Sequence, residues 1–339
     1  MPNRSNIWAL VLAAGDGKRL EPLTSAYGGP AIPKQYCSLR PGPSLLHDAL
    51  RRALAVTTHQ RTCVVVAEKH RCWWAAQSRL LPPDNVIVQP ENRATGVGIL
   101  LPLLHILDRD ARARIVILPS DHHVRVESCL VRSLRAALET IRLHEGRTLL
   151  LGVKPEEPDP ELGYIVPGAA NDPAALPVLQ FIEKPSTTDA LRLIERGALW
   201  NTFIIAGSIR GLLGLYERAV PELLTEMHRA VRRDREAASA GRSVTKLYAR
   251  LRSVDFSHDI LPGQESSIRV VRVPPCGWSD LGTPERVART LAHPPTEKMP
   301  TGKRTRHLDA QVSPLSLAEQ HARQATAITH PVRVSTRSY

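Results

Sequence analysis

The order of apolar and polar positions alternates between short apolar runs and longer stretches with helical spacing. We expect buried strands at residues 7–14, 62–67, 85–89, 114–118, 148–153, 164–166, 178–183, 202–208 and 267–273. We expect helices between them, around Trp73 and at 45–55, 96–107, 130–143, 186–196, 211–216 and 221–240. Strands alternating with helices at this spacing indicate βαβ units. The pattern predicts an α/β fold, Rossmann-like, with a mainly parallel mixed sheet and helices on both faces.

The charge of the chain narrows the choice of partners. Lys and Arg number 45 and Asp and Glu 33, so the formal charge is +12. This favours nucleic acid, an acidic membrane surface or phosphorylated small molecules. Periodicity fades beyond Pro294, and we expect an ordered domain over residues 1–295 and a basic, flexible tail over 296–339. Such tails are more often solvated appendages than binding segments, so nucleic acid is not an expected partner.

The cysteines favour a reducing compartment. Their number, five, is odd and no C-x-x-C pair occurs, which fits neither a disulfide framework nor a structural zinc site. The apolar run at 7–14 is followed by charged residues where a signal peptide would be cleaved. No run approaches the roughly 18 apolar residues needed to span a bilayer. We expect a cytoplasmic protein without a membrane partner.

The first strand leads into a glycine-containing turn. Gly15 and Gly17 directly follow the apolar run, and Lys18, Arg19 and Lys34 are near in sequence. Glycines at this position let backbone N–H groups approach an oxyanion, and the basic residues suit a polyphosphate.

Three other interpretations of this turn compete. A P-loop would need glycine at position 12 and Ser or Thr at 19, but Leu12 and Arg19 stand there. A dinucleotide-binding fingerprint would need a third glycine at position 20, which is Leu20. An ordinary strand-to-helix turn with incidental basic residues is the third.

The stretch from Leu12 to Thr24, L-A-A-G-D-G-K-R-L-E-P-L-T, followed by Pro33-Lys34-Gln35, resembles the signature of sugar-1-phosphate nucleotidyltransferases. Within them it is most similar to mannose-1-phosphate guanylyltransferases. The resemblance implies the nucleotide-diphospho-sugar transferase (GT-A-like) fold, with 1–295 as the catalytic domain. Lys18 departs from the Thr or Ser usual in the family.

Two distant aspartates are candidate metal ligands. Asp121 follows the strand 114–118, at the sheet edge where parallel α/β folds bind ligands. Asp121 could instead cap the next segment, or bind zinc together with the flanking histidines. Mg²⁺ suits carboxylate and phosphate oxygens better than zinc does. Asp280 lies in Gly277-Trp278-Ser279-Asp280-Leu281-Gly282, which alone is common turn chemistry. Both stretches resemble the family blocks that supply its two metal-binding aspartates.

A second group of motifs concerns the sugar phosphate. Glu183 and Lys184 end a strand before Pro185, which alone could be an exposed ion pair. They resemble the family's F-x-E-K-P block, which implies that Lys184 meets the sugar phosphate and Glu183 the sugar hydroxyls. Gly163 resembles the family glycine that passes the sugar, and Asn201 its sugar-contacting asparagine. Phe203 replaces the glycine expected after that asparagine, which puts the pocket's shape in question.

The resemblance extends to the nucleotide. Asn92-Arg93-Ala94-Thr95 is similar to a segment near the base in guanylyl enzymes, and Asp255 aligns with a family aspartate of unclear role. The implied nucleotide-binding residues are Ala13, Ala14, Gly15, Asp16, Gly17, Lys18, Arg19, Lys34, Asn92, Arg93, Thr95, Ser120 and Asp121.

The reaction implied is transfer of GMP from GTP to mannose 1-phosphate, with Mg²⁺ as cofactor and Arg19, Lys34 and Lys184 as catalytic residues. A UTP or dTTP enzyme acting on glucose 1-phosphate is the nearest alternative. A non-catalytic nucleotide-sugar-binding subunit and a nicotinamide oxidoreductase are alternatives from other classes. A homodimer is one possible assembly.

Overall fold

The computed structural model describes residues 6–17, 24, 31–39, 42–143, 146–170, 174–237 and 241–293. Lys18, Arg19 and the predicted tail at 296–339 lie outside this part of the chain. The strands are β1 (Ile7–Ala13), β2 (Thr62–Ala67), β3 (Val86–Gln89), β4 (Arg114–Pro119), β5 (His123–Val124), β6 (Thr148–Val153), β7 (Tyr164–Pro167), β8 (Leu176–Ile182), β9 (Leu199–Ser208), β10 (Ile268–Val273) and β11 (Trp278–Ser279). The helices are α2 (Leu45–Leu54), α3 (Arg71–Gln77), α4 (Ala94–Arg109), α5 (Glu127–Leu143), α6 (Thr187–Glu195), α7 (Ile209–Ala219), α8 (Pro221–Glu236), α9 (Arg242–Tyr248) and α10 (Pro284–Ala292).

Nine of these strands form one mixed sheet, in the order β3-β2-β1-β4-β9-β6-β10-β8-β7. β3, β2, β1 and β4 are parallel, as are β6 and β10. β9 is antiparallel to both of its neighbours, β4 and β6, and so joins the two parallel parts. β7 and β8 complete the far edge in antiparallel pairing. The carboxyl ends of β1 and β4 therefore open on the same edge.

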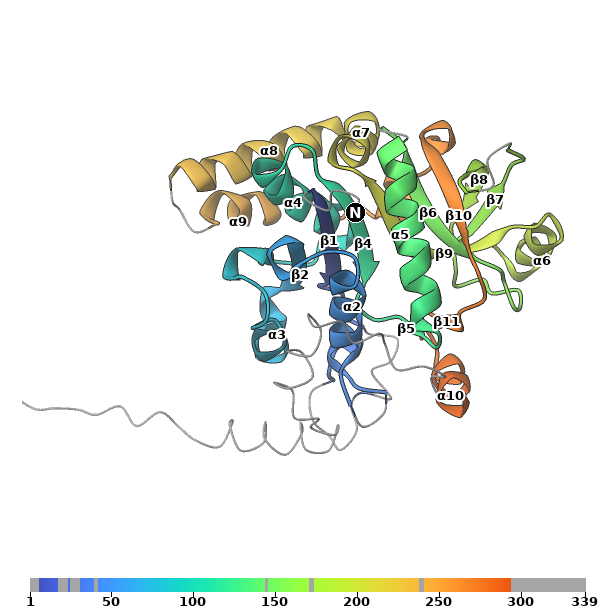
Figure 1. The fold of residues 1–339 in the computed structure, drawn as a ribbon. Coiled ribbons are helices and arrows are strands. Elements are labelled where there is room, and N and C mark those ends of the chain that lie inside the picture. Colours follow the sequence, from blue (N-terminus) through green and yellow to red (C-terminus); the bar gives the residue numbers. More distant parts are fainter. Residues whose placement is uncertain are drawn as a thin grey trace, which may run out of the picture.

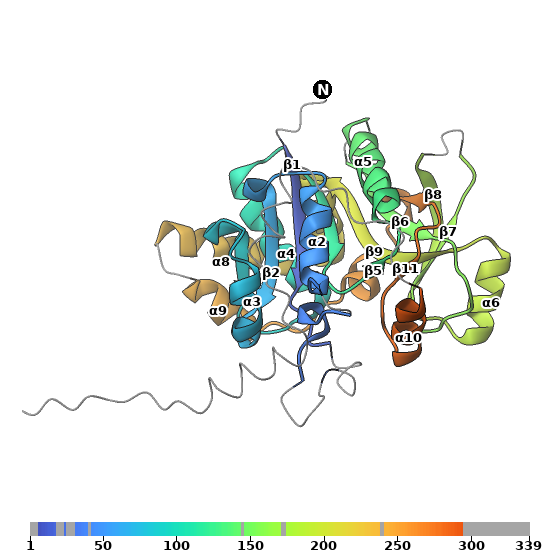
Figure 2. The same ribbon diagram turned by 60° about the horizontal axis from the view of Figure 1, so that its bottom comes forward.

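Helices cover both faces of the sheet, as the sequence predicts (Figure 1). α2 and α5 pack on one face, and α4, α7 and α8 on the other. Alternate residues of β1 point to the two sides, so Ala9 and Val11 join one core and Trp8 and Leu10 the other. Figure 2 shows α6 and α10 beside the β6–β7 end of the molecule and α3, α8 and α9 beside β2. The predicted fold class is confirmed.

Local signals explain where several helices begin. Ser44, Ser186, Ser208 and Thr283 precede α2, α6, α7 and α10, and each side chain accepts a hydrogen bond from a backbone N–H in the first turn. Such caps satisfy donors that have no partner within the helix. None of the helices in the described ranges has the length and apolar character needed to cross a bilayer.

The structure adds elements that the sequence pattern does not reveal. The predicted helix at 221–240 ends at Glu236, and α9 follows it as a separate helix. β9 begins at Leu199 instead of 202, so Asn201 lies within the strand. The two-residue strands β5 and β11 and the helix α10 were not predicted. Two residues are too few for an alternating pattern to be recognised.

Candidate active site

The turn after β1 is held in place by hydrogen bonds from two residues that directly follow Lys34. The side-chain nitrogen of Gln35 donates to the carbonyl oxygens of Ala13 and Gly15, at 3.1 and 2.8 Å. The Tyr36 hydroxyl also donates to the Ala13 oxygen, at 2.9 Å. Because these donors take the carbonyl groups from one side, the turn keeps a fixed shape without using its own N–H groups. Such a turn fits the predicted role of binding an oxyanion.

Gly17 explains why the turn requires glycine. Its φ is +65°, in the left-handed region, and a Cβ there would lie 2.8 Å from the backbone nitrogen of Lys34. Asp16, between the glycines, pairs with Lys69 at 2.6 Å. Any larger residue at position 17 must therefore displace the segment bearing Lys34.

Lys34 lies between the two aspartates predicted to hold a metal. Its ammonium is 2.9 Å from Oδ2 of Asp121 and donates to the backbone carbonyl of Asp280 at 2.6 Å. The Lys34 side chain is 9% exposed and that of Asp121 35%. One buried cation thus contacts residues that are 159 positions apart in the sequence. The structure brings all three to one place.

A small sheet accounts for this convergence. β5 directly follows Asp121 and His122 and pairs antiparallel with β11, Ser279 opposite His123 and Trp278 opposite Val124. Asp280 is the next residue after β11. Because β5 follows β4 closely in the sequence, its pairing with β11 places Asp280 near the carboxyl end of β4.

At the same edge of the sheet, Ser120 links the end of β4 to β1. The Ser120 hydroxyl donates to the Leu12 carbonyl at 2.5 Å, and the Ser120 backbone N–H to the same oxygen at 3.2 Å. Ser120 is buried, and its hydroxyl and backbone N–H both donate to Leu12, so its contact with nucleotide stays a prediction.

The electrostatics favour two ionised carboxylates beside a neutral histidine. Burial opposes ionisation of Asp121, but Lys34, His122 and a backbone hydrogen bond together outweigh it, and the pKa of Asp121 lies below its ordinary value. The pKa of Asp280 is also lowered, against burial, by His122, which is protonated at the acid pH where Asp280 titrates, and by Arg286 and Lys34. Burial, together with Lys34 and Arg52, lowers the pKa of His122 to about 4 in spite of the neighbouring Asp121. His122 therefore adds no charge at neutral pH.

The donor set fits Mg²⁺ better than zinc. The described residues contain no cluster of three or more His, Cys, Asp or Glu side chains able to hold a metal. Zinc sites usually have three or four such ligands, whereas Mg²⁺ is commonly bound by one or two carboxylates together with substrate phosphates and water. Asp121 and Asp280 supply two carboxylates on residues that both contact Lys34, so the residue types present are compatible with Mg²⁺.

A second cluster contains three of the residues predicted for the sugar phosphate. The backbone N–H of Asn201 donates to the carbonyl of Gly163 at 2.8 Å. A Cβ on Gly163 would lie 2.5 Å from Oε2 of Glu183. The glycine therefore leaves room for this carboxylate. Burial and the neighbouring charge of Asp255 raise the pKa of Glu183 to about 7, against the effect of Lys184.

The segments around these residues have unusual backbone conformations. In the described part of the chain four residues other than glycine have positive φ, and all lie within the predicted motifs: Ala94 (64°), Lys184 (49°), Phe203 (56°) and Leu281 (53°). Such conformations are costly for residues with a Cβ and concentrate at functional sites. Lys184 is exposed at the end of β8, beside Glu183.

The predicted base-binding segment is anchored to Asp255, whose charge acts on Glu183 of the second cluster. The Thr95 hydroxyl donates to Oδ2 of Asp255 at 2.8 Å, and Arg93 donates to the carbonyl of Tyr248 at 3.0 Å. The side-chain oxygen of Asn92 accepts from the N–H of Ala94. These contacts fix the position of the segment. They also mean that the side chains of Thr95 and Arg93 already have hydrogen-bond partners within the protein.

The two clusters adjoin each other. Trp200 precedes Asn201, and its ring centroid lies 6.4 Å from that of Trp278, two residues before Asp280. The glycine turn, Lys34 and the two aspartates thus lie next to a second cluster that contains a glutamate of raised pKa, an arrangement suited to joining two phosphorylated substrates. Comparison with known proteins supports this. The family model described as "Nucleotidyl transferase" matches residues 8–293.

The chain belongs to the nucleotidyl transferase family.

Individual relatives carry related names. A protein of Sinorhizobium fredii named mannose-1-phosphate guanylyltransferase is 27% identical over 277 residues, which cover 80% of this chain and 52% of that protein. The alginate biosynthesis protein AlgA of Pseudomonas syringae is 28% identical, over 80% of this chain and 56% of its own length. This nucleotidyl transferase chain thus spans about half the length of the curated relatives it matches.

A solved structure gives the same result for the fold. The crystal structure of a Thermus thermophilus protein described as mannose-1-phosphate geranyltransferase superimposes with a TM-score of 0.71. It is 29% identical, and the match covers 84% of this chain and 80% of that one. The predicted family resemblance is confirmed.

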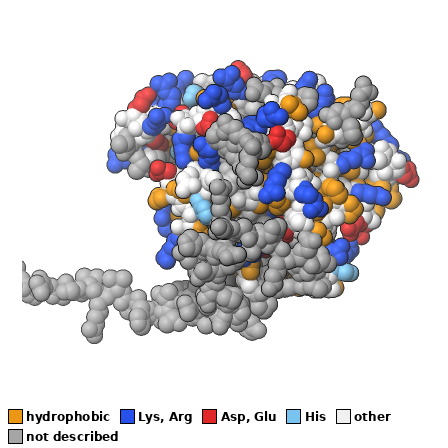
Figure 3. All heavy atoms as spheres, in the orientation of Figure 1, with side chains coloured by type: hydrophobic (Ala, Val, Ile, Leu, Met, Phe, Trp, Pro, Cys, Tyr) orange, Lys and Arg blue, Asp and Glu red, His pale blue; other side chains and the backbone are white. Residues whose placement is uncertain are grey.

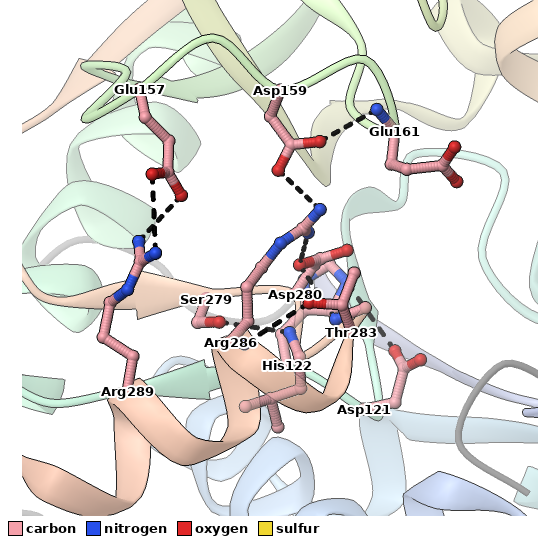
Figure 4. A network of polar contacts seen from close by, with 12 residues as sticks. Asp121, His122, Glu157, Asp159, Glu161, Ser279, Asp280, Thr283, Arg286 and Arg289 are labelled. Atoms are coloured by element: carbon pink, nitrogen blue, oxygen red, sulfur yellow. Dashed lines mark hydrogen bonds and ion pairs between the residues drawn. The ribbon is translucent and has the colours of Figure 1, made fainter. Parts of the chain in front are cut away.

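Several residues of this nucleotidyl transferase site were not predicted from the sequence. Two of them are Arg286 of α10 and Asp159, which form an ion pair, and Arg286 also pairs with Asp280 (Figure 4). Asp255 was named from the sequence without a role; in the structure it accepts a hydrogen bond from Thr95, and its charge raises the pKa of Glu183. Nothing in the sequence around Arg286 distinguishes it from the other arginines of the chain. On the face seen in Figure 3 the described Lys and Arg side chains are spread among other types, so charge alone does not locate the site.

Proposed function

We propose that the chain transfers GMP from GTP to mannose 1-phosphate, which releases pyrophosphate and forms GDP-mannose. The observation that carries the proposal is the position of Lys34 between Asp121 and Asp280, next to the glycine turn. This arrangement supplies backbone donors, one cation and two carboxylates within one site. The name of the Sinorhizobium fredii relative, mannose-1-phosphate guanylyltransferase, favours guanosine and mannose over other bases and sugars.

The nucleotide would occupy the edge formed by β1 and β4. Backbone N–H groups of residues 14–17 would face the triphosphate, and Lys34 would turn from Asp121 to the phosphate around which charge develops. Mg²⁺ would be held by Asp121 and Asp280, and when bound it supplies positive charge that offsets repulsion between the two phosphorylated substrates. The segment at 92–95 would lie near the base, and Lys18 and Arg19 stay predicted triphosphate contacts.

The sugar phosphate would occupy the second cluster. Glu183 would accept hydrogen bonds from sugar hydroxyls, and Gly163 leaves the room that its carboxylate occupies. Asn201 would contact the same sugar, and exposed Lys184 would orient its phosphate.

The reaction is then a single in-line displacement. An oxygen of the sugar phosphate attacks the α-phosphorus of GTP, a new P–O bond forms, and the bond from the α-phosphorus to the oxygen bridging to the β-phosphorus breaks. The electron pair leaves with pyrophosphate, so no covalent intermediate with the protein is needed. The protein's contribution is to position the two substrates and to neutralise charge.

The test is a pyrophosphate-release assay of four nucleoside triphosphates against mannose, glucose and N-acetylglucosamine 1-phosphates, with and without Mg²⁺. We expect GTP with mannose 1-phosphate and Mg²⁺ to be the fastest combination. A faster reaction with UTP or dTTP and glucose 1-phosphate would reassign the substrates within the family. Binding of GDP-mannose without release of pyrophosphate from any pair would contradict an enzymatic function and favour a binding subunit.

A further inference from the structure

Arg286 connects one of the proposed metal ligands to a second carboxylate. It lies in the first turn of α10, and its guanidinium contacts Oδ1 of Asp280 with one nitrogen and Oδ2 of Asp159 with the other (Figure 4). The Asp159 contact measures 2.5 Å. Asp159 belongs to the loop that follows β6, so Arg286 joins three separate segments at the site.

This charge triad is shielded from water. The side chains of Arg286, Asp280 and Asp159 are 12%, 10% and 9% exposed. Taking charges out of water is costly unless they are paired with good geometry, so a buried arginine shared by two carboxylates is strongly constrained in position. Asp159 is itself fixed, because its Oδ1 accepts from the backbone N–H of Glu161 at 2.9 Å and its own N–H donates to Tyr164.

The contacts on Asp280 are unequal between its two oxygens. Oδ1 accepts from Arg286 and from the backbone N–H of Gly282, the latter at 3.1 Å. For Oδ2 the described residues provide no hydrogen-bond donor or ion-pair partner. Oδ2 instead lies over Gly282, where a Cβ would come within 2.5 Å. The protein thus occupies one carboxylate oxygen and leaves the other available.

We propose that Arg286 is a positioning residue for the metal site: by bridging Asp280 to Asp159 it orients the Asp280 carboxylate so that Oδ2 can bind the cation. The inference rests on the proposed function, in which Asp280 is a metal ligand. It goes beyond that function because the residue acts through Asp280, and because it gives α10 and the loop after β6 a part in catalysis. Partners that hydrogen-bond to ligating carboxylates typically contribute about 10–100-fold to metal affinity or activity.

The chain offers a matched control one turn further along α10. Arg289 pairs with Glu157 of the same loop at 2.7 Å, and these side chains are 50% and 44% exposed. Arg289→Gln therefore removes a similar link between α10 and the loop, without a contact to Asp280. If Arg286 served only to anchor α10 to the loop, loss of either arginine would affect metal binding in the same way.

The experiment compares Arg286→Lys, Arg286→Gln, Asp159→Asn and Arg289→Gln with wild type. Binding of Mn²⁺ alone is measured by the electron paramagnetic resonance of the free ion, with Asp280→Asn as the reference for loss of the site. The Mg²⁺ concentration that gives half-maximal pyrophosphate release is measured in parallel, and thermal unfolding reports the fold. Lysine keeps the charge but cannot make both contacts with two nitrogens, so Arg286→Lys separates orientation from charge.

We expect Arg286→Lys and Arg286→Gln to weaken Mn²⁺ binding and to raise the half-maximal Mg²⁺ concentration by about tenfold or more. Asp159→Asn should shift both in the same direction, and Arg289→Gln should leave both unchanged. Should Arg286→Gln fail to fold, the lysine and Asp159→Asn variants decide. Wild-type metal binding in Arg286→Lys would overturn the proposal, since charge alone would then suffice. Mn²⁺ binding that Asp280→Asn leaves intact would overturn the proposed metal site and this inference together.

Discussion

The ammonium of Lys34 lies 2.9 Å from the carboxylate of Asp121, in a site where the lysine side chain is almost fully buried. The same ammonium donates to the Asp280 carbonyl. Lys34 thus neutralises the negative charge of Asp121, the same charge that would attract Mg²⁺ in the proposed complex. When nucleotide binds, Lys34 would move from Asp121 to a phosphate, and the Asp121 carboxylate would then be able to hold Mg²⁺. The pair is therefore suited to exchange partners during the reaction.

Lys34→Gln should lower kcat by about 10²–10³-fold, as is typical when one preorganised donor to a developing charge is removed. The melting temperature should fall as well, because Asp121 loses its partner, although the 35% exposure of that carboxylate limits the cost. Steady-state kinetics and thermal unfolding measure the two effects. Lys154→Gln, at an exposed position after β6, is the control. A kcat unchanged in Lys34→Gln would remove Lys34 from the mechanism.

The two glycines of the turn should respond differently to alanine. A Cβ on Gly17 meets the backbone of Lys34, whereas one on Gly15 has no atom within 4 Å. We expect Gly17→Ala to lower both the melting temperature and kcat. Gly15→Ala should fold as wild type yet raise the KM for GTP several-fold, because the space beside Gly15 would be filled by phosphate. Calorimetry and substrate titration distinguish them. Normal GTP kinetics in Gly15→Ala would place the triphosphate elsewhere.

The sequence could predict the site's parts better than their connections. The glycine turn, Asp121 and Glu183 follow recognisable strands, and strand ends locate ligand sites in α/β folds. The pairing of β5 with β11 involves two residues in each strand, which is too few for an alternating apolar–polar pattern to be recognised in the sequence. It nevertheless determines where Asp280 lies.

Long-range side-chain contacts were equally hidden. Arg286 reaches Asp159 across more than 120 positions, and Thr95 reaches Asp255 across 160. Each is a residue type that is ordinarily found at the surface, and only the fold brings it against its partner. Such pairs become identifiable only when three-dimensional proximity is known.

Asp280→Asn should abolish most turnover while leaving the fold largely intact. The amide keeps an oxygen for the N–H of Gly282, and Arg286 retains Asp159 as a partner. Loss of one charge on a metal ligand should reduce kcat by about a hundredfold or more. Pyrophosphate release across a Mg²⁺ titration measures this, and circular dichroism checks the fold. Full activity in a folded Asp280→Asn protein would exclude Asp280 from metal binding.

Glu183 should make the protein less stable as pH rises. Its pKa is about 7 in the folded protein against an ordinary 4.5, so the folded state retains a proton that the unfolded chain loses. The stability gained from that proton is complete below about pH 4.5 and is lost as pH rises through about 7. Glu183→Gln removes this dependence. Relative to wild type it should gain roughly 1–3 kcal/mol in unfolding free energy between pH 5 and 8.

Urea denaturation at several pH values measures the difference, and the sugar 1-phosphate KM of Glu183→Gln should rise in the same samples. A stability difference that stays constant from pH 5 to 8 would contradict the raised pKa. An unchanged KM would contradict the contact with sugar hydroxyls, whatever the outcome for stability.

Phe203 should influence the choice of sugar through its ring and stability through its backbone. Its φ is +56°, its N–H donates to Oδ1 of Asn201 at 3.0 Å, and its ring lies edge-on to Phe256 with centroids 6.2 Å apart. Phe203→Gly and Phe203→Ala both remove the ring, but only alanine keeps the strain of a left-handed residue, about 1 kcal/mol. Glycine should therefore be the more stable variant by that amount in urea denaturation. Both should change the kcat/KM ratio between mannose and glucose 1-phosphates in the same direction, with the KM for GTP unchanged. If the ratio stays that of wild type in both variants, the ring does not shape the sugar pocket.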